Sequence, residues 1–135
     1  MVESVALHLE GLGHEVRRLA YGAPWTEVGR EVALSVAAGD VDFGIVCCWT
    51  GTGVSIAANK VPGVRAALCV DAPTATGARR WNDARVLALS LRLTTPALAL
   101  EIVDAFLEGL PDADELERIA SLEGVRGSAQ APMTP

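Results

Sequence analysis

The stretch that decides the fold is Cys48-Trp49-Thr50-Gly51-Thr52-Gly53, which follows an apolar run at 41–47 and precedes a helical pattern at 54–60. A strand, a glycine-bearing turn and a helix in this order bring free backbone N–H groups and the positive end of a helix dipole together, where an anion can bind. A thiol and two hydroxyls stand at the same corner. The sequence therefore predicts a functional site at the end of this strand.

Helical and extended patterns alternate on both sides of this stretch. The predicted helices are 2–12, 26–38, 54–60, 74–81, 96–110 and 114–122, and the predicted strands are 15–19, 41–47, 65–70 and 85–90. Thr26 is a predicted N-cap, and Thr95 is another because Pro96 follows it. Strands separated by helices form a parallel sheet, so we expect an α/β, Rossmann-like three-layer fold with a parallel sheet flanked by helices.

Length and composition favour one domain at 1–123, followed by a Gly/Ser/Pro tail at 124–135 that we expect to be disordered. Half of the 135 residues are apolar and only 4% are aromatic, so the core is expected to consist of Ala, Val, Leu and Ile. The net charge of −6 disfavours nucleic acid and anionic membranes as partners. The three cysteines, 47, 48 and 69, are odd in number and two of them are adjacent, which argues against a disulfide framework and favours the reducing cytoplasm. The sequence contains neither a CxxC motif nor a Cys/His cluster, so it indicates no structural metal site.

Three sequence motifs occur in a fixed order along the middle of the chain. They are Asp42-Phe43-Gly44-Ile45-Val46 with the Cys48–Lys60 turn and helix, then Arg65-Ala66-Ala67-Leu68-Cys69, then Asn82-Asp83-Ala84. Over about residues 11–107 the chain resembles ribose-5-phosphate isomerase B and the galactose-6-phosphate isomerase subunits. The resemblance implies aldose–ketose isomerisation of a sugar or sugar phosphate without a cofactor. It also implies a homodimer, or a dimer of dimers, with active sites between subunits.

This isomerisation needs a base that moves one carbon-bound proton and donors that hold an enediolate oxygen. Cys48 is the predicted base because a thiol facing a helix N-terminus has a lowered pKa, and the resemblance assigns the same role. Thr50 is the predicted oxyanion donor beside the N–H groups of the turn. The predicted substrate-binding residues are Trp49, Gly51, Thr52, Gly53, Trp81, Asn82 and Arg92. Cys47 is expected to point to the opposite face of the sheet, into the core.

Simpler interpretations remain open for the same residues. Cys48 can be a small buried apolar residue, and the turn an ordinary helix cap. Val54 stands where another branch of the family has a catalytic glutamate, which leaves the thiol as the candidate base in the motif. A nucleotide-binding turn is disfavoured because GxGxxG and GxxxxGK[ST] do not occur.

Departures from the family pattern weaken the choice of substrate. The family begins with a strand ending in Asp-His, central in a 2-1-3-4-5 sheet, and we expect residues before Met1 to supply it. Trp81 stands where the family has a ring-opening histidine, and Trp49 where it has a glycine. Residues 110–115 are acidic where the family has phosphate-binding arginines, so Arg118 is the only cation that this part of the sequence offers to a phosphate. The alternatives are a degenerate member that binds a small polyol or anion, and one subunit of a hetero-oligomeric isomerase.

Overall fold

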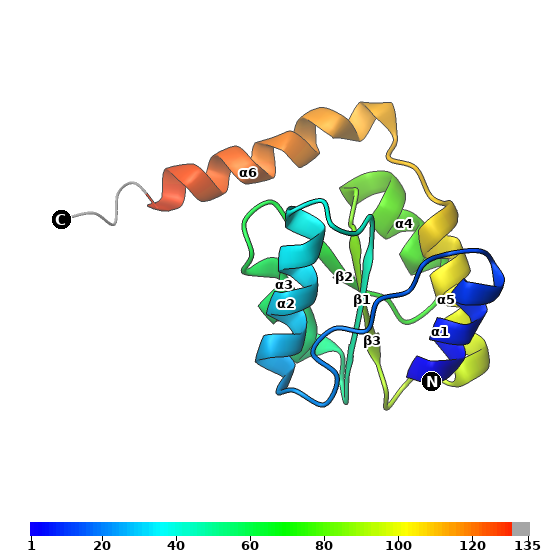
Figure 1. The fold of residues 1–135 in the computed structure, drawn as a ribbon. Helices are drawn as coiled ribbons and strands as arrows, with labels where there is room; N and C mark the ends of the chain where they lie inside the picture. Colours follow the sequence, from blue (N-terminus) through cyan, green and yellow to red (C-terminus); the bar gives the residue numbers. More distant parts are fainter. Residues whose placement is uncertain (131–135) are drawn as a thin grey trace.

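A computed structural model describes the backbone of residues 1–130 and the side chains of residues 1–123. From residue 25 to residue 108, helices and strands alternate along the chain, as Figure 1 shows. The helices are α1 (Val2–Gly11), α2 (Trp25–Ala37), α3 (Thr52–Asn59), α4 (Ala72–Asn82), α5 (Pro96–Glu108) and α6 (Leu116–Gln130), with a 3-10 turn η1 (Ala113–Glu115). The strands are β1 (Gly44–Cys48), β2 (Ala66–Leu68) and β3 (Val86–Ser90). The predicted α/β class and layered arrangement are confirmed.

The strands are parallel, and their order in the sheet is β1-β3-β2. The order 2-1-3-4-5 expected from the sequence is therefore wrong, because it would place β2 between β1 and β3. Burial explains the difference. All five residues of β3 are buried, as a strand covered on both faces and both edges requires, whereas β2 has only three residues and each is only partly buried. A continuous apolar strand gains most from the central position.

The two faces of β3 supply two separate cores. Leu87 and Leu89 pack with α1, α4 and α5 on one face, where Phe106 is the largest fully buried side chain. Val86 and Ala88 pack on the other face with buried residues of α2 and α3. Figure 1 shows the same division, with α2 and α3 on one side of the strands and α1, α4 and α5 on the other. The period-2 alternation of a strand therefore sorts the apolar residues between the layers.

The predicted strand at 15–19 does not form within the described residues. Its backbone is not part of the sheet, and only Val16 packs against a core cluster. Arg18 instead pairs with Glu3 and Glu10 of α1, at 3.0 and 3.6 Å. An extended segment becomes a strand only when a neighbouring strand accepts its backbone hydrogen bonds.

Two helix boundaries also differ from the prediction. α2 begins at Trp25 after Pro24, so the prediction of Thr26 as its N-cap is wrong. The other predicted N-cap is confirmed, because the Thr95 hydroxyl accepts a hydrogen bond from Leu98 N at the start of α5. α6 continues to Gln130, past the predicted end at 122, so the part of the predicted disordered tail at 124–130 has helical backbone. Residues 131–135 of that tail lie outside the described residues. Across residues 1–130, no helix combines the length and apolar character needed to cross a membrane.

Asn59, the last residue of α3, closes the outer edge of β2. Its side-chain amide donates to Ala66 O at 2.9 Å, and its carbonyl oxygen accepts from Ala66 N at 2.8 Å. These are the two bonds that another strand would otherwise offer. The side chain therefore protects this sheet edge from pairing with a foreign strand.

Asp83 is the electrostatic anchor of the amino edge of the sheet. It ends α4 in the left-handed conformation, with φ of 45°, and its carboxylate lies 3.0 Å from Arg79, 3.2 Å from Arg65 and 3.8 Å from Arg85. Only 3% of the Arg79 side chain is exposed, and its guanidinium lies 4.9 Å from the centre of the Phe43 ring. The carboxylate thus compensates a buried positive charge.

We predict that Asp83→Asn lowers the free energy of unfolding by about 3 kcal/mol, because the buried Arg79 guanidinium then lacks its anion. Asparagine tolerates the left-handed conformation, so the change isolates the charge. Denaturant titration measures the loss, and Asp40→Asn, an exposed carboxylate with no ion pair to a described residue, is the control. Equal stability of the two variants would show that the anchor contributes nothing.

Candidate active site

The turn after β1 brings the predicted catalytic residues together at the carboxyl edge of the sheet. β1 ends at Cys48, and α3 begins at Thr52. Gly51 between them has φ of 79°, and a Cβ there would lie 2.5 Å from Leu68 Cδ1 and 3.0 Å from backbone atoms of Leu89 and Ser90. Only glycine fits this conformation and this close approach. The turn therefore directs the backbone N–H groups at the start of α3 back toward the strand end.

These N–H groups surround the thiol of Cys48. Burial by itself raises the pKa of this thiol, but hydrogen bonds from the backbone N–H groups of Val54, Gly51, Thr50 and Gly53 lower it, and the net pKa is below the ordinary value. The thiolate is thus stabilised by backbone dipoles at a helix N-terminus. Cys48 lies where the sequence predicted an activated thiol.

The other two thiols have the opposite electrostatic environment. Burial, reinforced by the neighbouring Cys48, raises the pKa of Cys47 to about 11. Burial and the carboxylate of Asp71 raise the pKa of Cys69 to about 11. Cys47 packs against the core cluster that contains Leu87 and Leu89, whereas Cys48 packs against the one on the other face. The predicted opposite orientation of the adjacent cysteines is confirmed.

The loop after β3 holds the turn in place. Leu91 N donates to Cys48 O at 3.0 Å, and Arg92 N donates to Trp49 O at 2.9 Å. The hydroxyl of Ser90 also donates to Trp49 O, at 3.1 Å. Arg92 is exposed and forms no ion pair with any described residue. The structure therefore brings the predicted Arg92 to the cradle, by which we mean the turn 48–53 and the start of α3.

Side chains of the cradle are open to solvent. The hydroxyls of Thr50 and Thr52 are 2.8 Å apart, and both residues are exposed. Trp49 is 66% exposed beside them. Val54, in contrast, is fully buried in the core, and its apolar side chain cannot transfer a proton. The open hydroxyls and indole are available to a ligand.

Trp25 of α2 contacts the cradle, which the sequence did not reveal. Its indole lies directly on Gly53, where a Cβ would come within 2.9 Å of ring atom Cε3. Half of its surface is exposed. The only signal in the sequence is a rare aromatic residue at a helix start, and it does not show which loop the ring contacts.

Trp81 and Asn82 do not join the cradle within one chain. α4 runs from the carboxyl end of β2 back to the amino edge of the sheet, and Asn82 is its last residue. There the carbonyl of Asn82 accepts a bond from Arg65 Nε at 2.8 Å, and the Trp81 indole folds back onto Gly77. Both residues line a groove of about 570 Å³ along α4. The predicted site is therefore divided between opposite edges of the sheet.

The described residues offer no evident metal site, since no three His, Cys, Asp or Glu side chains cluster among them.

A sequence model described as Ribose/Galactose Isomerase matches residues 1–122 of the chain. The chain belongs to this family. The family resemblance drawn from the sequence motifs is thereby confirmed, and the match includes the cradle, the loop after β3 and α4.

Individual family members are similar over much of the chain. Ribose-5-phosphate isomerase B of Escherichia coli (strain K12) is 45% identical over 97 residues, which are 69% of this chain and 65% of that protein. D-erythrulose-4-phosphate isomerase of Pectobacterium atrosepticum is 41% identical over 103 residues, 73% of this chain and 68% of that protein. The match to the Escherichia coli protein thus spans less than two thirds of its length.

A solved structure has the same fold. Ribose-5-phosphate isomerase B of Clostridium thermocellum aligns with a TM-score of 0.90 and 36% identity, over 94% of this chain and 89% of that chain. The arrangement of strands and helices is therefore that of a known family member.

We predict that iodoacetamide near neutral pH modifies Cys48 and leaves Cys47 and Cys69 unmodified, because only the thiol in the cradle has a lowered pKa. Peptide mass spectrometry identifies the modified residue. The rate plotted against pH should reach half its maximum well below the pKa of about 11 of Cys47.

Gly53→Ala should raise the pH at which the alkylation rate of Cys48 reaches half its maximum. The added Cβ at position 53 collides with the Trp25 ring and displaces the backbone N–H groups that surround the thiol. Gly11→Ala is the control, since open space surrounds Gly11. A midpoint for Cys48 as high as that for Cys47 would contradict the assignment.

Proposed function

We propose that the protein is an aldose–ketose isomerase that acts on a sugar or sugar phosphate, without a cofactor, through an enediolate. The observation that carries the proposal is the thiol of Cys48, held by the backbone N–H groups of the turn that follows it. Membership in the Ribose/Galactose Isomerase family supports the same reaction. Two matched relatives are named isomerases of phosphorylated sugars, of five and of four carbons.

The Cys48 thiolate is the proposed base. It takes the proton from C2 of the open-chain aldose, and the electrons of that C–H bond form the C1–C2 double bond while the carbonyl oxygen becomes an enediolate oxygen. The proton of the C2 hydroxyl then moves to the C1 oxygen, and the thiol returns its proton to C1. C2 thereby becomes the ketone carbonyl, which completes the ketose and regenerates the thiolate. No electron acceptor is needed, because C1 is reduced as C2 is oxidised.

The cradle suits this step because it favours negative charge before and after the proton moves. In the resting site the N–H groups stabilise the thiolate. Once the sulfur is protonated, the charge resides on the enediolate oxygen near the same helix N-terminus, with the Thr50 hydroxyl as a further donor. Since these dipoles are fixed by the backbone, they need little reorganisation during the reaction.

A second copy of the chain is part of the proposal. Trp81 and Asn82 lie at the amino edge, so their predicted contact with the sugar requires them to come from a neighbouring subunit. We therefore propose a homodimer or a dimer of dimers with sites between subunits. A cytoplasmic location fits this chemistry, since a catalytic thiol needs a reducing compartment.

A binding protein without turnover is the second candidate, because Trp81 replaces an acid–base residue of the family. Indole has one N–H donor and exchanges no proton near neutral pH. A degenerate member of this kind would bind a small polyol or anion in the cradle. A subunit of a hetero-oligomer, in which another chain supplies the missing groups, is the third candidate.

We predict that the protein exchanges the C2 proton of a four- or five-carbon sugar phosphate with solvent deuterium. Cys48→Ala should reduce the rate at least about a hundredfold, the usual effect of removing a general base. Cys47→Ala is the control and should retain most of the activity, because that thiol faces the core. NMR of the C2 proton measures the exchange, and no exchange across pentoses, tetroses and their phosphates would favour the binding protein.

We predict that Arg92→Met raises KM for a phosphorylated sugar tenfold or more, since a hydrogen bond to a charged group contributes about 1.5–3 kcal/mol. KM for the unphosphorylated sugar should stay unchanged, because we assign the Arg92 guanidinium, which is exposed and forms no ion pair with a described residue, to the phosphate. Steady-state kinetics with the matched pair of sugars measures both values. An equal effect on the two sugars would assign Arg92 to the sugar hydroxyls instead.

A further inference from the structure

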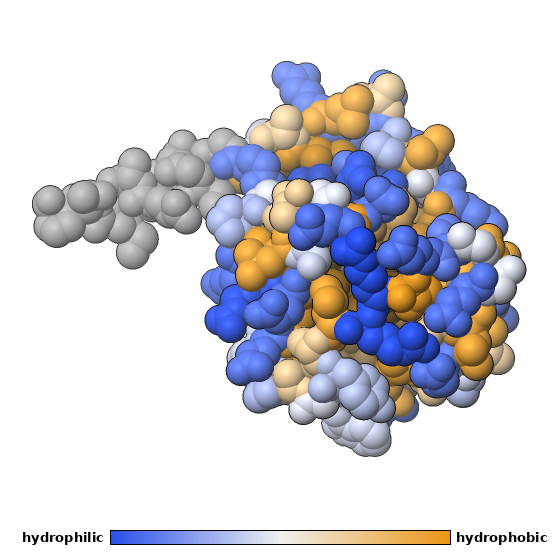
Figure 2. All heavy atoms as spheres, in the orientation of Figure 1, coloured by the Kyte–Doolittle hydropathy of each residue, from blue (hydrophilic) through white to orange (hydrophobic). Residues whose placement is uncertain are grey.

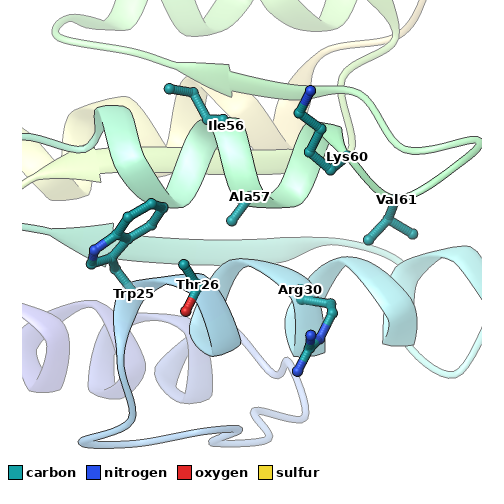
Figure 3. Close-up of a pocket in the computed structure, with 7 residues that line it drawn as sticks. All are labelled: Trp25, Thr26, Arg30, Ile56, Ala57, Lys60 and Val61. Carbon is teal, nitrogen blue, oxygen red and sulfur yellow. The ribbon is translucent and has the colours of Figure 1, made fainter.

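The indole of Trp25 packs on the first turn of α3, whose backbone N–H groups surround the thiol of Cys48. A Cβ on Gly53 would lie 2.9 Å from Cε3 of the Trp25 ring, 3.0 Å from Cδ2 and 3.4 Å from Cζ3. These atoms belong to the six-membered part of the ring, so this part covers the glycine. Figure 3 shows the ring reaching from the start of α2 toward α3. The indole thus takes the space that a side chain at position 53 would fill.

Exposure alone does not single out Trp25, although half of its side chain is exposed. Figure 2 shows apolar side chains exposed among charged ones on the face that it draws. Leu34, on the same helix as Trp25, is 46% exposed. Scattered exposed apolar residues of this kind are normal on a protein surface. What distinguishes Trp25 is its contact with the turn that holds the thiol.

Close packing of α2 on α3 keeps the ring in place. Trp25 and Gly29 are four residues apart on α2, and Gly53 and Ala57 are four residues apart on α3, so each pair lies on one face of its helix. A Cβ on Gly29 would lie 2.6 Å from Ala57 Cβ and 2.8 Å from the carbonyl oxygen of Val54. The backbone of α2 therefore lies directly against α3 one turn beyond the ring. This contact fixes the start of α2 beside Gly53.

The first turn of α3 needs such support. Gly51 precedes the helix and Gly53 is its second residue, and glycine gives a helix end more conformational freedom than other residues do. The N–H groups of a first turn have no partner within their helix. Here the N–H groups of Gly53 and Val54 bond to the sulfur of Cys48 and are among those that lower its pKa. A ring that covers Gly53 preserves their direction.

We propose that Trp25 is a positioning residue of the cradle, whose indole holds the first turn of α3 where its N–H groups bind the Cys48 sulfur. In this role the indole acts through Gly53 and does not contact the reacting atoms. The ring also excludes water from the turn, and hydrogen bonds are electrostatically stronger in such a setting than in water. The inference rests on the proposed function for its catalytic consequence, which is a base that stays ionised near neutral pH.

The ionisable side chains around the thiol are unaffected by a change at position 25. Within their described bounds, α3 and β3, which pack beside Cys48, contain no ionisable side chain. The charged or ionisable groups on the neighbouring segments are Cys47 of β1, the Met1 amino group that acts on Cys47, Glu27, Arg30 and Glu31 of α2, Lys60 after α3 and Arg92 after β3. A changed titration of Cys48 in a Trp25 variant therefore reports on the backbone N–H groups.

Alkylation of Cys48 by iodoacetamide across a pH series tests the role without any sugar. Trp25→Ala should raise the pH of half-maximal rate by about half a unit or more, because the N–H groups move away from the sulfur. Trp25→Phe should keep the wild-type midpoint, since a flat ring still covers Gly53. Leu34→Ala shortens an exposed side chain on the same helix and is the control, with no expected change. The midpoint reports the thiolate, whereas the maximal rate reports access to it.

A second substitution guards against misfolding, which circular dichroism monitors. Trp25→Leu keeps an apolar side chain at the groove of about 330 Å³ between α2 and α3 but has no flat ring, so it should raise the midpoint as well. An unchanged midpoint in the folded variants, or an equal rise in Trp25→Phe, would overturn the role of the indole.

A double variant tests whether Trp25 acts through Gly53. Gly53→Ala alone should raise the midpoint, because the new Cβ collides with the ring. In the Trp25→Ala background the ring is gone, so the same Cβ finds room and should raise the midpoint no further. Effects of residues in contact are non-additive in this way. Equal rises in both backgrounds would show independent effects and refute the coupling.

Turnover separates this inference from the proposed function. Trp25→Ala should lower kcat for exchange of the C2 proton about threefold near neutral pH, since half a pKa unit corresponds to that factor. KM should stay near the wild-type value, and kcat should recover above the raised midpoint. A raised KM with unchanged kcat would assign Trp25 to substrate binding instead. Shifted midpoints without any exchange refute the isomerase alone, and exchange with unshifted midpoints refutes the role of Trp25 alone.

Discussion

The position of β3 between β1 and β2 is the constraint on which the rest of the structure depends. Within the described residues, both other strands pair with β3 alone, and its four apolar residues, 86–89, supply side chains to the cores on both faces. The register places Ser90 beside Cys48, so the loop after β3 reaches the carbonyls of Cys48 and Trp49. The geometry around the thiol is thus fixed by a buried strand distant in sequence.

Charge is handled differently in each part of the molecule. At the amino edge a single carboxylate, Asp83, compensates a buried guanidinium, which is the usual requirement for charge in an apolar interior. At the cradle, backbone N–H groups lower the pKa of Cys48 and so favour its thiolate form. Backbone dipoles stay in place when the negative charge moves from the thiolate to a substrate. A flexible lysine side chain beside the thiolate would instead pair with the sulfur and change position as the charge moves. Backbone stabilisation therefore suits the proposed role of Cys48 as a base, which would be protonated and deprotonated in every cycle.

Parallel topology explains why the predicted site is divided. Each helix after a strand returns the chain to the opposite edge, so the beginning of α3 and the end of α4 lie at opposite edges of the sheet. Cys48 lies just before the beginning of α3, and Asn82 is the last residue of α4. A protein of this topology unites such residues only when two copies associate, as proposed above.

The sequence by itself determined the alternation of strands and helices, the family, and the glycine turn with its activated thiol, because periodicity and turn chemistry are local properties. Adjacent Cys47 and Cys48 were likewise assigned to opposite faces by the strand period alone. Tertiary structure decided the central place of β3, the absence of a strand at 15–19, the contact of Trp25 with Gly53 and the distance of Asn82 from the cradle. Each of these depends on which distant segment offers hydrogen bonds or apolar contact, and no local pattern records that choice.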